Sequence, residues 1–380
     1  MTQLAPVDVI GGAVRAAGIV ELEPTPAGIV LHRMPAWARV RHNDISLPLL
    51  ETMPSGARLE MTTDATCLEL DVHLTLVQIG TEIGPAAVFE VFVDGQLAAE
   101  HTTRTGTLIV VDPRTGAAEF QPGGAVTVRF DGLPAGEKRV DVWLPHAAAV
   151  RLIELRADGA VSAARSGLPR WVHYGSSISH CLEATRPTGV WPVVAALRAG
   201  VDLQSFAFAG QCHLDPFAAR MIAAQPADYI SVKLGINIVN GDTMRERTFV
   251  PALHGVLDTI RDRHPDVPVV LVTPITCPVA EDHPGPTVTD RVGQCNVIER
   301  AVELSTGALT LQRIRVLESE VVAARQSAGD ANLHLLSGPD LFGPDDVGDL
   351  PDGLHPNAAG YQRMGERFHR LVFEQGPFRR

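Results

Sequence analysis

The stretch Trp171-Val172-His173-Tyr174-Gly175-Ser176-Ser177-Ile178-Ser179 decides how the second half of the chain folds. Its first four residues are typical of a buried strand, Gly175 ends that strand, and two serines follow. In an α/β sheet a nucleophile is presented in this way, at the carboxyl end of a strand. A glycine turn filled with polar residues has the same local sequence. The interpretation therefore depends on the residues that follow downstream.

Downstream of this stretch, strand and helix patterns alternate to the end of the chain. We expect strands at 171–174, 204–208, 228–234, 267–272 and 331–336, and helices at 191–199, 216–224, 247–262, 309–325 and 358–373. Such alternation predicts an α/β fold with a doubly wound, mainly parallel, flavodoxin-like sheet and helices on both faces. The long Pro-rich segment 274–294 is expected to form an ordered loop over the site.

Upstream, the hydrophobic pattern has a period of two from the start of the chain to about residue 156. Leu68, Leu70, Val72, Leu74 and Leu76 alternate with polar residues, which places five apolar side chains on one face of a strand. Asp94-Gly95 favours a tight hairpin. Further strands are expected at 107–111, 126–130, 138–144 and 150–155. These patterns predict an all-β sandwich or jelly-roll domain over 1–160, a linker within 157–169, and a catalytic domain over 168–380.

Composition excludes several classes of protein. The chain has 380 residues, 45% of them hydrophobic, and a formal net charge of −12, which argues against nucleic acid or an anionic membrane as the main partner. No run reaches the ~18 consecutive apolar residues of a membrane span. The five cysteines form no C-x-x-C pair, so neither a disulfide framework nor a zinc site is predicted. We expect a cytoplasmic enzyme that acts on small molecules; the sequence predicts no particular oligomeric state.

Three further groups of residues fall where the other strands are expected to end. Gly210 follows the second strand, Gly235-Ile236-Asn237 follows the third, and Asp352 and His355 precede the last helix. Acyl transfer needs a nucleophile, a base, an acid that orients the base, and donors for the oxyanion. We assign these roles to Ser177, His355 and Asp352, with the oxyanion held by the N–H groups of Ser177 and Gly210 and by the Asn237 side chain. Ser176 is the alternative nucleophile.

These four blocks resemble those of the SGNH or GDSL-type serine hydrolases, and the resemblance covers about residues 168–378. Ser176 replaces the usual Asp of the first block, and Ile238 replaces the Asp that often follows the block-three Asn; neither position carries a triad role. The two-domain layout looks like the carbohydrate-esterase branch with a jelly-roll N-terminus. Within it, the resemblance is greatest to a group that includes a salicylyltransferase of a tetracycline pathway, which moves an aryl group from coenzyme A to a hydroxyl. This resemblance implies acyl-CoA as a co-substrate, with no bound cofactor.

Other polar residues compete for places in the pocket. His180 lies three residues after Ser177 and His213 three after Gly210, so both are candidates to line it, together with Ser176 and Trp191. Each of the two histidines is also explained as an ordinary loop residue, and Trp191 as packing under the first helix. His180, His213 and Asp215 do not form the compact ligand set that a metal site needs, and we predict none. Lys233, at the end of the third strand, is expected to have a structural role.

Three functions are compatible with these residues. The first is an O-acyltransferase that moves an acyl or aryl group, such as salicylyl, to a hydroxyl of a polyketide-type natural product. The second is an esterase or deacetylase, because water can release the same acyl group from the same serine. The third is a glycan-binding protein in which a carbohydrate-binding sandwich is joined to a degenerate hydrolase. An intact Asp352 and His355 pair disfavours the third.

Overall fold

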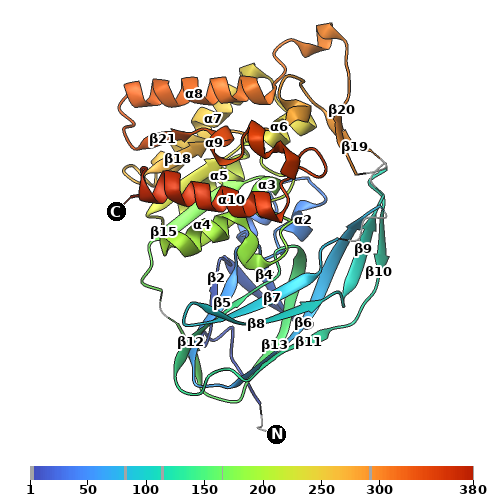
Figure 1. The fold of residues 1–380 in the computed structure, drawn as a ribbon, viewed down its shortest axis with the longest axis vertical. Helices are drawn as coiled ribbons and strands as arrows, with labels where there is room; N and C mark the ends of the chain where they lie inside the picture. The colour runs from blue at the N-terminus through green and yellow to red at the C-terminus, as the bar shows by residue number, and fades with distance from the viewer. Residues whose placement is uncertain (1–3, 81–83, 113–114, 165, 291–292, 380) are drawn as a thin grey trace. The chain divides into compact units, whose positions relative to one another are not determined.

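The chain divides into two compact units. A computed structural model describes residues 4–80, 84–112, 115–164, 166–290 and 293–379 (Figure 1). One unit consists of Met1–Gly167 with Thr185–Val190, and the other of Leu168–Ala184 with Trp191–Arg380. We call them the sandwich unit and the α/β unit. The short segment Thr185–Val190 thus packs with the sandwich unit although it follows the serine stretch in the sequence.

The sandwich unit is all-β, as the alternating pattern predicts. Its strands are β1 Ala5–Pro6, β2 Arg15–Ala17, β3 Glu21–Thr25, β4 Gly28–His32, β5 Arg58–Thr63, β6 Cys67–Ile79, β7 Ala87–Val93, β8 Gln96–Thr103, β9 Thr107–Val111, β10 Ala118–Gln121, β11 Val126–Asp131, β12 Lys138–Trp143, β13 Ala148–Ala157 and β14 Val161–Ala163. Short helices are α1 Ala36–Arg39, α2 Leu47–Leu50 and the 3-10 turn η1 Pro187–Gly189. One sheet runs β10-β9-β6-β13-β4-β3, with β1 and β11 paired to it, and the other runs β14-β5-β12-β7-β8 with β2. Among the described residues of this unit, the strands pair in antiparallel fashion, with the exception of β6 and β9, which are parallel.

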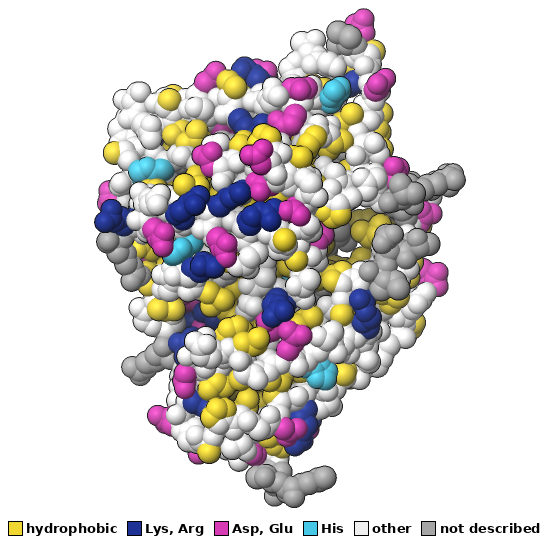
Figure 2. Space-filling view, viewed as in Figure 1, with side chains coloured by type: hydrophobic (Ala, Val, Ile, Leu, Met, Phe, Trp, Pro, Cys, Tyr) yellow, Lys and Arg dark blue, Asp and Glu magenta, His cyan; other side chains and the backbone are white. Residues whose placement is uncertain are grey.

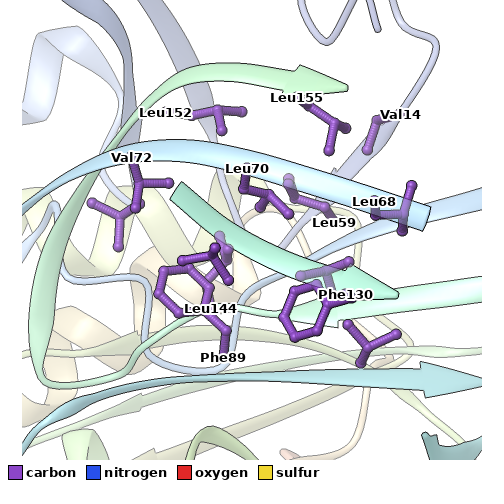
Figure 3. Close-up of a cluster of buried hydrophobic side chains, with 14 of the residues drawn as sticks. Val14, Leu59, Leu68, Leu70, Val72, Phe89, Phe130, Leu144, Leu152 and Leu155 are labelled. Carbon is purple, nitrogen blue, oxygen red and sulfur yellow. The ribbon is translucent and has the colours of Figure 1, made fainter. Parts of the chain in front are cut away.

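The core of this unit lies between the two sheets. The five apolar residues predicted on one face of β6 are all buried, and the polar residues between them are only partly covered. Figure 3 shows Leu68 and Leu70 of β6 facing Leu59 of β5 and Phe89 of β7, which come from the other sheet. Apolar side chains that alternate along each strand therefore interdigitate between the sheets, which is the packing of a β-sandwich.

Two local features of the sandwich differ in how well the sequence predicts them. The Asp94-Gly95 turn joins β7 to β8 in an antiparallel hairpin, as expected. The segment 157–169, interpreted above as a linker, also contains β14, which pairs with β5. Val161 of that strand packs against the sandwich core, and the strand extends the sheet at the edge formed by β5.

The α/β unit contains a parallel sheet in the order β16-β15-β17-β18-β21. Its strands are β15 Arg170–Gly175, β16 Asp202–Ala207, β17 Tyr229–Lys233, β18 Val269–Val272 and β21 Leu333–Leu336. Its helices are α3 Ser177–His180, α4 Trp191–Ala199, α5 Pro216–Ala224, α6 Ile236–Gly241, α7 Glu246–Arg261, α8 Leu311–Ser327, α9 Gly338–Leu341 and α10 Ala358–Phe368. Shorter elements are the 3-10 turns η2 Pro278–Ala280, η3 Val302–Ser305 and η4 Pro344–Asp349, the π-helical turn His369–Glu374, and the hairpin strands β19 Thr287–Thr289 and β20 Cys295–Val297.

The strand order places the ends of β15 and β17 at the centre of this unit. Numbered along the chain, the five strands run 2-1-3-4-5, so the order of the sheet reverses between β15 and β17. Ligands in doubly wound sheets bind beyond the carboxyl ends of the strands at such a reversal. In Figure 1, α4 and α10 pack together in front of the sheet, and α5 pairs with α7. The fold predicted for this half of the chain is confirmed.

The Pro-rich segment 274–294 is ordered where the structure describes it. It contains η2 and β19, and β19 pairs with β20 in a small hairpin. At its end, the Gln294 side chain donates to the Pro351 carbonyl (2.8 Å), and the Cys295 N–H donates to the Asp352 carbonyl (2.8 Å). These two bonds attach the hairpin to the loop that carries Asp352.

Charged side chains of both signs are interspersed on the surface that carries α10 (Figure 2). Arg363 and Arg367 of this helix pair with Asp346, and Arg363 also pairs with Asp349. Within the described ranges, no helix has the length and apolar composition that a transmembrane segment requires.

Candidate active site

Ser177 lies at the first turn after the central strand β15. Ser176 caps the following helix α3, since its hydroxyl accepts a hydrogen bond from the Ile178 N–H, and Ser177 is the first residue of that helix. A side chain at position 175 is excluded, because a Cβ there would lie 2.4 Å from the Ser179 hydroxyl. The tight turn that results leaves Ser177 7% exposed at the carboxyl edge of the sheet.

His355 and Asp352 lie on the loop between η4 and α10, and this loop brings them to Ser177. The His355 Nε2 is 2.9 Å from the Ser177 hydroxyl oxygen, and its Nδ1 is 2.6 Å from Asp352 Oδ2. The second carboxylate oxygen, Asp352 Oδ1, accepts hydrogen bonds from the N–H groups of Leu354 (2.8 Å) and His355 (2.7 Å). The structure therefore brings together serine, imidazole and carboxylate in one continuous series of hydrogen bonds.

Electrostatics favour an ionised Asp352 and a basic His355. Burial alone would raise the pKa of Asp352, but hydrogen bonds and the charge of His355 hold that pKa below its usual value. Burial would lower the pKa of His355; the carboxylates of Glu183 and Asp352 outweigh it and raise this pKa to about 9. The Glu183 Oε1 lies 3.8 Å from His355 Nδ1. An imidazole with this pKa is a strong base that accepts a proton readily from a serine hydroxyl.

Gly210 and Asn237 lie after the two strands that flank β15. Gly235, at the end of β17, has φ = +109°, and a Cβ there would lie 2.6 Å from the Pro274 ring, so only glycine fits. The turn at Gly235 starts α6, a helix that the sequence pattern does not predict, and places Asn237 in its first turn. The Cys212 N–H donates to the Asn237 side chain (3.0 Å). Because an N–H needs an acceptor, the amide oxygen faces Cys212 and the Asn237 Nδ2 group faces away from it.

Three donors at this edge have no acceptor within the part of the chain that the structure describes: the N–H groups of Ser177 and Gly210, and the Asn237 amide. Gly210 is exposed, whereas Ser177 and Asn237 are 7% and 5% exposed, so water or a ligand can accept hydrogen bonds from these donors. The three strands that precede these residues are neighbours and parallel, so their carboxyl ends meet at the same edge. These donors have the chemistry that is needed to stabilise a negatively charged oxygen beside Ser177.

The other residues predicted for the pocket have mostly structural places. His180 is fully buried, and its Nδ1 accepts a hydrogen bond from the Ala209 N–H (3.4 Å). His213 contacts the Gly210 carbonyl (2.9 Å) and the Thr243 hydroxyl (3.1 Å), so it braces the loop of Gly210. Ser176 is buried as the cap of α3.

Trp191 is buried in an aromatic cluster and does not line an open pocket. Its side chain packs against Trp171, His173 and Phe368, and none of its surface is exposed. The prediction that Trp191 lines the pocket is therefore wrong. The alternative, that this ring packs under the first helix, agrees with the structure. The physical reason is that α10 lies against α4, so the ring at the start of α4 is covered by Phe368.

Two ionisable residues are buried beneath the site. His173 of β15 bonds Ser231 (2.8 Å) and Ser179 (2.9 Å). Burial lowers the pKa of His173 to about 3, so the ring is neutral and serves as a structural link. Lys233 of β17 is 1% exposed, and burial lowers its pKa to about 8. Its carbonyl accepts a bond from the Cys212 thiol (3.6 Å), which connects it to the residue that orients Asn237.

Sequence reasoning missed Glu183 and Cys212. Neither belongs to a recognised motif: Cys212 acts through its backbone N–H, which any residue except proline supplies, and Glu183 is an isolated acidic residue in a loop. The five cysteines are free. In the described ranges, no group of three or more His, Cys, Asp or Glu side chains is arranged to hold a metal ion.

The chain is similar to a known protein family and to several solved structures. Residues 173–363 match the family model of the GDSL-like lipase/acylhydrolases. No curated protein is significantly similar to the chain by sequence. Among solved structures, the salicylyl-acyltransferase SsfX3 from a tetracycline biosynthetic pathway is 28% identical, with a TM-score of 0.79, over 97% of this chain and 96% of that one.

Two further solved structures share the fold at lower identity. A GDSL-like lipase from Bacteroides ovatus is 17% identical, with a TM-score of 0.65, over 93% of this chain and 95% of that one. An active-site mutant of a family two carbohydrate esterase from Clostridium thermocellum is 15% identical, with a TM-score of 0.60, over 94% and 96% of the two chains. In each case the similarity spans both the sandwich unit and the α/β unit.

Proposed function

Because the chain belongs to the GDSL-like lipase/acylhydrolase family, we propose that it transfers acyl groups through a covalent ester on Ser177. The observation that carries this proposal is the series Ser177, His355 and Asp352, joined by contacts of 2.9 and 2.6 Å. A hydroxyl is a weak nucleophile by itself and needs an adjacent base that an acidic group orients. The hydrogen-bonded order of the three side chains supplies both requirements.

In the first half of the reaction, the Ser177 oxygen attacks the acyl carbon while His355 Nε2 takes the hydroxyl proton. The resulting oxyanion accepts hydrogen bonds from the N–H groups of Ser177 and Gly210 and from Asn237. The imidazolium is stabilised by Asp352, which already accepts its Nδ1–H. When the tetrahedral intermediate collapses, the bond to the leaving group breaks, and His355 returns the proton to that group. Ser177 now carries the acyl group.

In the second half, an acceptor hydroxyl gives its proton to His355 and attacks the acyl carbon. The ester bond to Ser177 breaks, and His355 returns the proton to the Ser177 oxygen. We propose that the acceptor is the hydroxyl of a natural product and that the donor is an acyl or aryl thioester of coenzyme A, for example salicylyl-CoA. The support is the similarity to the salicylyl-acyltransferase at 28% identity over nearly the whole of both chains.

The second candidate is an esterase, in which water replaces the acceptor alcohol. The family name itself, lipase/acylhydrolase, favours it, and so do the solved carbohydrate esterases with the same two-unit fold. The same acyl-enzyme serves both reactions, so the triad does not distinguish them. A glycan-binding protein with a degenerate hydrolase unit is disfavoured, because a degenerate site would not be expected to keep the hydrogen-bonded triad.

Intact-mass spectrometry after incubation with a panel of acyl-CoA thioesters should detect a protein species heavier by one acyl group, which peptide mapping locates on Ser177. Adding an excess of hydroxylated aromatic acceptors should convert this species to an acylated acceptor and free protein. Release of free acid alone, under saturating acceptor, would favour the esterase. The absence of any adduct, with a donor that the protein demonstrably consumes, would contradict the covalent mechanism.

Replacing Asn237 by Ala should lower kcat for an activated acyl ester by about 10²–10³-fold, because one oxyanion donor is lost. The variant also leaves the buried Cys212 N–H without its acceptor, at a cost of about 1–3 kcal/mol in the free energy of unfolding. Asn237→Asp separates the two effects, since it keeps an oxygen for Cys212 but removes the amide donor. It should lose activity without the loss of stability that the missing acceptor causes. Asn240→Ala, in the same helix, is the matched control; equal activity of Asn237→Asp and the wild type would contradict the assignment.

A further inference from the structure

Glu183 lies beside the triad and follows α3 by three residues. Cys181 ends this helix with a left-handed conformation (φ = +58°), and the Ala184 N–H bonds the Cys181 carbonyl (3.0 Å), so the chain turns sharply here. Glu183 Oε1 lies 3.8 Å from His355 Nδ1. That distance is too long for a hydrogen bond but short enough for a strong interaction between charges.

Tyr361 of α10 fixes the other end of this carboxylate. Its hydroxyl donates to Glu183 Oε2 at 2.6 Å, and the tyrosine side chain is fully buried. Burial raises the pKa of Tyr361 well above its usual value, so the phenol keeps its proton and can donate it. One oxygen of Glu183 is thus bound by Tyr361, and the other is near the imidazole.

The charged groups beside His355 are two carboxylates, and the other groups near it are neutral. Ser177 of α3 contacts Nε2, while Asp352 and Glu183 both lie on the Nδ1 side. The neighbouring thiols of Cys181, Cys277 and Cys295 stay neutral, because burial raises their pKa values. No lysine or arginine within the described ranges forms an ion pair with Glu183 or Asp352. Among the described residues, His355 is the basic side chain that lies within ion-pair distance of these two carboxylates, while the buried Lys233 interacts with the thiols of Cys181 and Cys277.

We propose that Glu183, held by Tyr361, is a second acidic positioning residue of the active site, which stabilises the protonated form of His355 and sets the pH range in which Ser177 is activated. This inference rests on the triad of the proposed function. Asp352 fixes the tautomer and orientation of the ring through a direct hydrogen bond, whereas Glu183 acts through its charge alone. The effect is greatest when the imidazole is charged, which includes both tetrahedral intermediates.

The arrangement has a consequence for the dependence of rate on pH. The base must be unprotonated before Ser177 attacks, and the two carboxylates raise the pKa of His355 to about 9. For the wild type, kcat/KM should therefore rise about tenfold per pH unit through the neutral range and level off near pH 9. Removal of one carboxylate lowers the pKa of the imidazole, so the plateau should begin at a lower pH.

The test is the pH profile of kcat/KM for an activated acyl ester, measured for Glu183→Gln and Tyr361→Phe. Glu183→Gln should level off roughly one pH unit lower than the wild type, with a plateau on the order of tenfold lower. Tyr361→Phe keeps the carboxylate of Glu183 but removes the hydrogen bond that holds it in place. This variant should shift the profile in the same direction by a smaller amount. The control is Glu320→Gln, an exposed residue of α8 that changes the net charge equally. Its profile should coincide with that of the wild type.

A Glu183→Gln profile with the midpoint of the wild type would overturn the inference. If that variant does not fold, as judged by its thermal unfolding, the profile of Tyr361→Phe decides instead, and an unshifted midpoint there has the same meaning. Ser177→Ala is measured in parallel under the same conditions. If Ser177→Ala is inactive and Glu183→Gln is unshifted, only the role of Glu183 is wrong; if Ser177→Ala is active, the proposed function itself fails.

Discussion

Ser177→Ala should lower the turnover of an activated acyl ester by on the order of 10⁶-fold and should abolish the acyl adduct. Removal of the nucleophile from a Ser-His-Asp site leaves only the activity that the oxyanion donors and substrate binding provide. The substitution deletes one oxygen at a position that is 7% exposed and whose hydroxyl contacts His355, so the fold should be retained. The measurement combines steady-state turnover with intact mass, and thermal unfolding verifies the fold.

Ser176→Ala is the matched control, because Ser176 is the neighbouring serine and the alternative nucleophile. Its hydroxyl accepts a hydrogen bond from the Ile178 N–H as the cap of α3, whereas the hydroxyl that contacts His355 belongs to Ser177. Loss of this cap should cost about 1 kcal/mol in the free energy of unfolding and leave turnover within about tenfold of the wild type. If Ser176→Ala were inactive and Ser177→Ala active, the assignment of the nucleophile would be reversed.

The fold could be predicted from the sequence wherever one period of the hydrophobic pattern persists. Leu68 to Leu76 alternate over a whole strand, and Phe249, Leu253, Val256 and Ile260 recur at helical spacing; all nine apolar residues of these two patterns are buried. Both patterns record which face of an element meets the core, and this is local information. Short elements such as β14 and α6 leave no such pattern. Their formation depends on tertiary contacts: β14 on the edge of β5, and α6 on the turn at Gly235.

The residues of the candidate site also fall into two groups, those that short sequence motifs predict and those that depend on tertiary contacts. Ser177, Gly210, Asn237, Asp352 and His355 could be proposed because each lies in a short block beside a strand or helix end. Glu183 could not, because its relation to His355 depends on the left-handed turn at Cys181 and on Tyr361, which lies 178 positions further along the chain. Trp191 is an error of the opposite kind, a residue predicted for the pocket that does not line it. Its position in the sequence lies near the site but does not reveal that Phe368 of α10 covers its ring.

Asp352→Asn should lower kcat by about 10⁴-fold, and the cause is the tautomer of His355 rather than the loss of contact. The two N–H groups of Leu354 and His355 hold Oδ1 of residue 352 and require an oxygen there. In the variant, the amide oxygen therefore stays on these donors, and the NH₂ group faces His355 Nδ1. An imidazole that accepts a bond at Nδ1 carries its proton on Nε2, the nitrogen that faces Ser177. This nitrogen can then no longer take the serine proton.

The tautomer can be observed directly. Nitrogen-15 spectra of histidine-labelled protein should show the His355 proton on Nδ1 in the wild type at high pH and on Nε2 in Asp352→Asn. Asp345→Asn, an exposed residue of η4 with the same change of charge, should retain both the wild-type tautomer and the wild-type kcat. This experiment distinguishes the roles of the two carboxylates beside His355. Glu183 lies 3.8 Å from His355 Nδ1, too far for a hydrogen bond that would fix which ring nitrogen carries the proton, so it cannot restore the tautomer. A kcat within tenfold of the wild type in Asp352→Asn would therefore contradict the role of Asp352 and indicate that the charge of Glu183 suffices.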